Sequence, residues 1–214
     1  MKKSSIFTLA FALLFLYSAS SLADITGTSH DLTTQTTLLT QAGNTQLCAY
    51  CHTPHSASST NTTTPLWNHQ DTTASNYTMY SSPSMNMVIA GAPAGVSLAC
   101  LSCHDGTVAA DQLINYPNSA NIQDGTAGIF TLGDSLGTDL SNDHPISLTY
   151  NVTQDPDFHA PDPATNTVNT LQLFGANGDQ VECGTCHSVH DNANEPFLRV
   201  SNAGSALCLS CHTK

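Results

Sequence analysis

The eight cysteines of this sequence are the residues best suited to chemistry, because all of them fall into four copies of one pattern. Each copy reads Cys-x-x-Cys-His, with two thiols three positions apart and a histidine directly after the second. Thiols at this spacing can form thioether bonds to the two vinyl groups of a haem, and the histidine can then bind the iron. We therefore predict four covalently attached c-type haems. The attaching residues are Cys48, Cys51, Cys100, Cys103, Cys183, Cys186, Cys208 and Cys211, and the proximal iron ligands are His52, His104, His187 and His212.

Other uses of paired cysteines explain the pattern less well. A disulfide framework is the commonest role of cysteines in exported chains, but it does not need a histidine after each pair. Zinc ribbons also use Cys-x-x-Cys pairs, and again the following histidine would have no role. A thioredoxin-like redox motif would occur once, beside a β-α-β pattern, and not four times.

Six further histidines lie outside the four motifs, and four irons with two histidine ligands each would use four of them. His55 and His190 are the strongest candidates, because each lies three residues after a proximal histidine. A residue at that distance sits beside the edge of its own haem and can reach only a neighbouring haem, which must then lie close. We expect His55 to serve the second haem and His190 the fourth.

His144 and His30 complete the predicted set of distal ligands. Acidic residues near His144 could orient its other ring nitrogen. His30 follows soon after the expected N-terminus of the exported chain, and His69 and His159 are left as spares. A methionine could replace a histidine at one iron and raise its potential. Packing against a haem is the simpler role for the methionines that precede the second motif.

The elements that must position these residues are short. The chain has 214 residues, only 9% of them charged, and its polar residues are mainly Thr, Ser and Asn. It contains no long stretch with helical periodicity and no sustained alternation of apolar and polar residues. We expect a mostly irregular fold with short α-helices at the motifs and little or no β-sheet, in which the four haems form the core. Residues 24–214 should form a single domain.

The N-terminal segment is predicted to direct export. Lys2 and Lys3 precede the apolar stretch Ile6–Tyr17, and small residues follow it, which is the pattern of a secretory signal peptide covering residues 1–23. The apolar stretch is too short to span a membrane, which takes about 20 residues, and we expect no membrane span elsewhere. The protein should therefore act outside the cell, at the cell surface or in the periplasm.

The charge of the chain limits its partners and its chemistry. Removal of residues 1–23 leaves 16 acidic residues against Arg199 and Lys214, a formal charge of −14. A nucleic-acid-binding protein needs a basic surface, so we expect no nucleic-acid partner. An enzyme that reduces a small anion would want cationic groups beside an open iron, and the chain offers only these two. We therefore favour electron transfer, with a multihaem oxidoreductase that keeps one open haem as the alternative.

Several segments occur in an order that is typical of one family. They are Cys48–His55, Pro65–Asn68, Cys100–Thr107, Asp143–Ile146 and Phe197–Arg199. In these segments the chain resembles multihaem cytochromes of the cytochrome c3 and doubled-CXXCH type, and more narrowly the OmcE-like tetrahaem nanowire cytochromes. The resemblance covers about residues 28–213 and implies bis-histidine ligation of every haem, stacked haem pairs and very little regular secondary structure. The chain departs from it at His69, where we would expect an Arg.

The resemblance also implies partners. We expect electron exchange with redox proteins or extracellular acceptors, and self-association into filaments. A monomeric electron carrier in the periplasm is the alternative. In a filament, His30 would bind a haem of the neighbouring subunit, whereas in a monomer it would serve a haem of its own chain. The sequence leaves both arrangements open.

Overall fold

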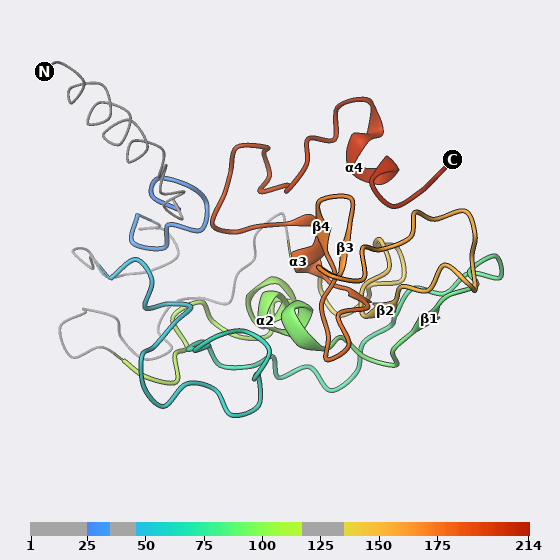
Figure 1. The fold of residues 1–214 in the computed structure, drawn as a ribbon. Helices are drawn as coiled ribbons and strands as arrows, with labels where there is room; N and C mark the ends of the chain where they lie inside the picture. Colours follow the sequence, from blue (N-terminus) through green and yellow to red (C-terminus); the bar gives the residue numbers. More distant parts are fainter. Residues whose placement is uncertain (1–24, 35–45, 117–134) are drawn as a thin grey trace, which may run out of the picture.

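A computed structural model describes residues 25–34, 46–116 and 135–214 of the protein. The predicted signal peptide, residues 1–23, lies outside this part of the chain. Most of the described chain forms turns and irregular segments, and the regular elements are short (Figure 1). The helices are α2 (Gly95–His104), α3 (Cys183–Cys186) and α4 (Ala206–Leu209), with a 3-10 turn, η1, at Ala203–Ser205. The strands are β1 (Val88–Ile89), β2 (Leu148–Thr149), β3 (Thr167–Val168), β4 (Leu171–Gln172) and β5 (Gln180–Val181).

Helix α2 is the longest element that the structure describes, with 10 residues, and it ends with the second Cys-x-x-Cys-His motif. Gly95 begins the helix with a φ of +56°, a left-handed conformation that glycine adopts without strain. The backbone N–H of Asp105 donates to the carbonyl of Leu101 and closes the last turn. Leu101 and Ser102 are fully buried, because α2 packs against the short helix α3 of the third motif.

Two small antiparallel sheets flank these helices. The strands of the first are ordered β1-β2-β5, with Leu148 of β2 opposite Ile89 on one side and Val181 on the other. The second sheet is the hairpin of β3 and β4. Strands of two residues contribute few hydrogen bonds, so side-chain packing must hold them together.

Two apolar clusters form the protein part of the core. The larger one lies on the sheets and contains Met87, Leu148, Tyr150, Val168, Leu173 and Val181. Cys211 of the fourth motif packs against it. The smaller cluster consists of Tyr50, Ala110 and Leu113, and both Cys51 and Cys103 pack against it. Each cluster therefore supports haem-attaching cysteines, while the expectation that haems form the main core stays a prediction.

Among the described residues, no helix is both long enough and apolar enough to cross a membrane.

Candidate haem-binding sites

Each motif forms one tight turn that ends at its histidine. In the first motif the backbone N–H of His52 donates to the carbonyl of Cys48 at 2.8 Å. The third and fourth motifs repeat this bond, from His187 to Cys183 at 3.0 Å and from His212 to Cys208 at 2.9 Å. Residues three apart on a helical turn share a face, so the two sulfurs of a motif can meet one haem edge. No disulfide joins any of the eight cysteines, so all of them are available for haem attachment.

The four motifs neighbour one another in chain order. Cys51 of the first motif and Cys103 of the second pack against the same apolar cluster, and burial raises the pKa of the Cys103 thiol, with Cys51 adding to the effect. The thiols of Cys100 and Cys183, in the second and third motifs, lie close enough that their interaction raises the pKa of Cys100 and lowers that of Cys183. This contact follows from the packing of α2 on α3.

The third and fourth motifs are also close. Burial raises the pKa of the Cys186 thiol, and neighbouring Cys183 and Cys208 raise it further. Burial and the neighbouring Cys186 together raise the pKa of the Cys211 thiol to about 11. Each attachment point therefore lies near the next one along the chain.

Two of the proximal histidines are oriented by backbone carbonyls. Nδ1–H of His52 donates to the carbonyl of Pro65 at 2.7 Å, and Nδ1–H of His187 donates to the carbonyl of Pro196 at 3.0 Å. A histidine that donates from Nδ1 keeps the lone pair of Nε2 available for a metal. These residues therefore fit the role of proximal iron ligand.

The first and third motifs share more than this bond. We call residues 48–68 the first unit and residues 183–199 the third unit. In the first unit, the N–H groups of Thr53 and Asn68 donate to Leu66 and Cys51, both at 2.9 Å. Leu66 has a left-handed φ of +55°.

The third unit has the same set of contacts. The N–H groups of Ser188 and Arg199 donate to Phe197 and Cys186 at 2.8 and 2.9 Å, and Phe197 has a φ of +57°. In each unit, the last residues therefore fold back along the motif and hold its haem-attaching turn through the same two hydrogen bonds. The two units are structural repeats, although their sequences share little beyond the motif, the histidine three residues later and one proline.

Two predicted distal ligands lie opposite proximal histidines. The ring centroid of His190 is 6.2 Å from that of His52, and the ring centroid of His30 is 6.0 Å from that of His104. Two imidazoles that bind opposite sides of one iron have centroids about 6 Å apart, because each metal–nitrogen bond is about 2 Å long. Both pairs therefore fit a bis-histidine haem. His190 lies beside the first motif, whereas we expected it to serve the fourth.

The environment of His30 keeps its ring neutral, as an iron ligand requires. Burial, together with nearby His104, His187 and His190, lowers the pKa of His30 to about 4. Its Nδ1 is buried and has no hydrogen-bond partner, and its ring lies edge-on to Phe197 with centroids 4.6 Å apart. His30 thus lies against the second motif of its own chain.

The other predicted distal ligands are more exposed. His144 lies near the fourth motif, where burial lowers the pKa of His212 and His144 lowers it further. Its Nδ1 contacts the carbonyl of Pro145 at 3.0 Å. His55 is exposed and takes part in neither of the two ring pairs, although its carbonyl accepts a hydrogen bond from Thr53.

The two spare histidines differ from each other. His69 is buried, and its ring nitrogens contact the carbonyls of Gln70 at 2.8 Å and Ala109 at 3.0 Å. Its Nε2 is also 3.4 Å from the sulfur of Cys103. Since both nitrogens face backbone carbonyls, His69 serves the packing around the second motif. His159 is exposed, and its backbone N–H donates to Cys211.

Sequence reasoning missed a buried carboxylate between the second and third motifs. Glu182 is 3% exposed and accepts hydrogen bonds from the hydroxyls of Ser97 and Ser147. Ser97 in turn accepts a bond from the N–H of Cys183 at 2.9 Å. Burial raises the pKa of Glu182. The only sequence signal is the order Glu-Cys-x-Thr, in which Thr185 accepts a bond from the N–H of Glu182 at the start of α3.

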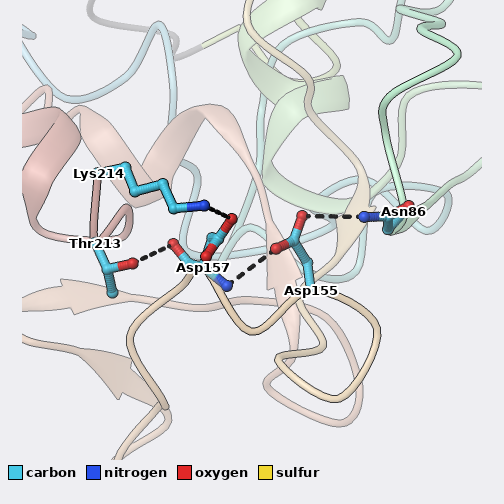
Figure 2. Close-up of polar contacts among 5 residues, drawn as sticks. All are labelled: Asn86, Asp155, Asp157, Thr213 and Lys214. Atoms are coloured by element: carbon cyan, nitrogen blue, oxygen red, sulfur yellow. Dashed lines mark hydrogen bonds and ion pairs between the residues drawn. The ribbon is translucent and has the colours of Figure 1, made fainter.

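The fourth motif is held by polar contacts at the end of the chain (Figure 2). Lys214 forms an ion pair with Asp157, and the hydroxyl of Thr213 donates to the carbonyl of Asp157 at 2.9 Å. The N–H of Asp157 donates to Asp155, which also accepts a bond from Asn86. These contacts fix the residues that directly follow His212.

The comparisons with known proteins bear on the C-terminal part of the chain. Residues 176–214, which contain the third and fourth motifs, match the family model described as the doubled CXXCH motif. This match supports a multihaem c-type cytochrome with covalently bound haem c. A search of curated proteins finds no match.

Proposed function

We propose that this protein is an exported tetrahaem c-type cytochrome that carries electrons along four closely spaced haems. The observation that carries the proposal is the order of the attachment points, each motif lying beside the next. When bound, each haem supplies one iron that gains and loses one electron. The protein would hold the haems in sequence and supply two histidines to each iron, which would leave no position for a substrate.

We propose four ligand pairs for these irons. The ring separations support His52 with His190 and His104 with His30. The position of His144 near His212 supports a third pair.

The remaining pair, His187 with His55, rests on the repeat. The first and third units have equivalent structures, and in this proposal His190 of the third unit binds the iron of the first haem. By the same geometry, His55 of the first unit would bind the iron of the third haem. This exchange would tie the two haems together and replaces our earlier expectation that His55 serves the second haem.

The position of His30 bears on assembly. Because it lies against His104 of its own chain, we assign it to the second haem in cis. We also propose, from the family resemblance, that subunits associate head-to-tail into filaments outside the cell, which would require a different residue at the junction. A monomeric periplasmic carrier is the alternative, and electron micrographs of the secreted fraction distinguish the two.

The competing function is that of an oxidoreductase with one open haem. It is disfavoured because both basic side chains after residue 23 are already engaged. Nε–H of Arg199 donates to the carbonyl of Gly184, and Lys214 pairs with Asp157.

A pyridine haemochrome assay combined with a carbon monoxide difference spectrum tests the proposal. We expect four haems per chain and no spectral change with carbon monoxide, because every iron is six-coordinate. Fewer than four haems would contradict the tetrahaem proposal, and a haem that binds carbon monoxide would favour the enzyme.

A further inference from the structure

The first and third units each end in a side chain that holds the haem-attaching turn. Nδ2–H of Asn68 donates to the carbonyl of Ala49 at 2.6 Å, and Nε–H of Arg199 donates to the carbonyl of Gly184 at 2.7 Å. Ala49 and Gly184 occupy the same place, directly after the first cysteine of each motif. The two side chains therefore play the same positioning role in equivalent structures.

The two side chains differ in charge. Asn68 is neutral and buried, and its amide also donates to the carbonyl of Asn115 at 2.9 Å. Arg199 carries a full positive charge, which lowers the pKa of the Cys186 thiol in the turn that it holds, and also that of His190, the proposed distal ligand of the first haem. The third unit thus has a fixed cation beside its haem-attaching turn where the first unit has a neutral amide.

A fixed positive charge near a haem favours the reduced state, because reduction removes one positive charge from the iron. Acidic residues outnumber basic ones by 16 to 2 after residue 23, so Arg199 is one of only two fixed cations that could act on a haem in this way. The other cation, Lys214, is paired with Asp157 beside the fourth motif.

We propose that Arg199 is a positioning residue that also raises the reduction potential of the third haem, whose attaching turn it holds, whereas Asn68 holds the attaching turn of the first haem without a charge of its own. The inference rests on the proposed tetrahaem function. It predicts that two haem sites with the same local structure differ in potential because of one side chain.

The test is a spectroelectrochemical titration of the haem-loaded protein and three variants. Arg199→Gln keeps an N–H donor and removes the charge, Arg199→Lys keeps the charge, and Lys214→Gln removes the other cation as a matched control. The haem content of each variant is measured in parallel. Haem methyl signals in NMR, followed through the titration, identify the haem whose midpoint moves.

We expect Arg199→Gln to lower the reduction potential of the third haem. The equilibrium constant for its reduction should fall about three- to tenfold, which is the size of a Coulomb effect in a partly exposed site. The difference from wild type should shrink at high salt because the charge is screened. Arg199→Lys should retain most of the wild-type potential, and Lys214→Gln should leave the third haem unchanged.

Two results would overturn the inference. One is a four-haem Arg199→Gln protein whose third haem keeps its potential, and the other is an Arg199→Lys protein that loses as much potential as Arg199→Gln. If Arg199→Gln does not retain four haems, an Arg199→Lys protein whose third haem has a clearly lower potential than in the wild type would overturn the inference. A wild-type protein without covalent haem would instead overturn the proposed function, and this inference with it.

Discussion

The second and fourth motifs have the same five residues, Cys-Leu-Ser-Cys-His, but very different surroundings. In the second motif Leu101 is 0% exposed, because the motif ends a ten-residue helix packed on α3. In the fourth, Leu209 is 47% exposed, and α4 spans only four residues at the edge of the molecule (Figure 1). The motif thus specifies haem attachment, while the surrounding chain decides how far each site is buried.

This difference suggests different roles for the two haems in the proposed electron path. A haem at the second motif would lie among the other sites and help to hold the fold. A haem at the fourth motif would lie at one end of the series, where the chain is exposed and a redox partner can approach. Removal of each haem in turn separates these roles.

The largest effect is expected from loss of haem attachment at the second motif. Replacing Cys100 and Cys103 with Ala should prevent formation of a compact protein, because the second motif is buried and its haem would be part of the packed interior. The same change at Cys208 and Cys211 should leave a folded protein with three haems. Haem content and resistance to protease measure the outcome. If both variants are equally compact and equally resistant to protease, the two motifs do not differ in their contribution to the fold.

The next largest effect concerns the buried carboxylate behind the second motif. Glu182→Ala should lower the free energy of unfolding by about 1–3 kcal/mol, because it leaves the hydroxyls of Ser97 and Ser147 without their acceptor. Glu182→Gln should lower the free energy of unfolding by less, since its amide oxygen can still accept a hydrogen bond from a serine hydroxyl. Urea titrations measure both values, and Asp179→Ala in a neighbouring turn provides an acidic control.

The pH dependence of stability should also report on Glu182. Burial raises the pKa of Glu182 in the folded protein above its ordinary value of 4.5. The folded state therefore binds the proton more tightly than the unfolded state, and stability is lost as the pH rises from 4.5 through the raised pKa. Glu182→Gln should lack this component of the loss. The same pH profile in both proteins would show that the carboxylate does not titrate in this way.

These buried contacts also show where sequence reasoning stops. The predictions of haem-attaching cysteines and proximal histidines rest on local patterns, because each motif spans five consecutive residues, and they stay predictions. The structure has helices at the second, third and fourth motifs and a turn at the first. The pairing of His190 with His52 could not be predicted, because these residues are 138 positions apart and no local pattern links them. Glu182 and Asn68 were missed for the same reason, since their roles depend on partners distant in sequence. His69 was a spare ligand candidate because it is a histidine outside the motifs, but both of its ring nitrogens contact backbone carbonyls.

A smaller effect, confined to one iron, is expected from the distal ligands of the two motifs. His30→Ala should convert the iron of the second haem to high spin, and His144→Ala should do the same at the fourth. Four haems stay attached in both variants because every motif is intact. Absorption spectra detect the change, with His159→Ala as the control. A fully low-spin His30→Ala protein would exclude His30 as a ligand.

The smallest effect concerns the contacts that hold the end of the chain. Lys214→Gln removes an ion pair between side chains that are 76% and 49% exposed, so it should lower the free energy of unfolding by at most about 1 kcal/mol. The loss should disappear at high salt. A larger loss would mean that the fourth motif depends on the contact between Lys214 and Asp157 (Figure 2) more than the exposure of these side chains indicates.

The central claim is that four irons lie in series and that each has two histidine ligands. Low-temperature electron paramagnetic resonance of the oxidised protein, with spins counted against chain concentration, tests it most directly. We predict four low-spin ferric irons per chain and no high-spin signal. A high-spin signal that accounts for one iron per chain, or a total below four, would contradict the account.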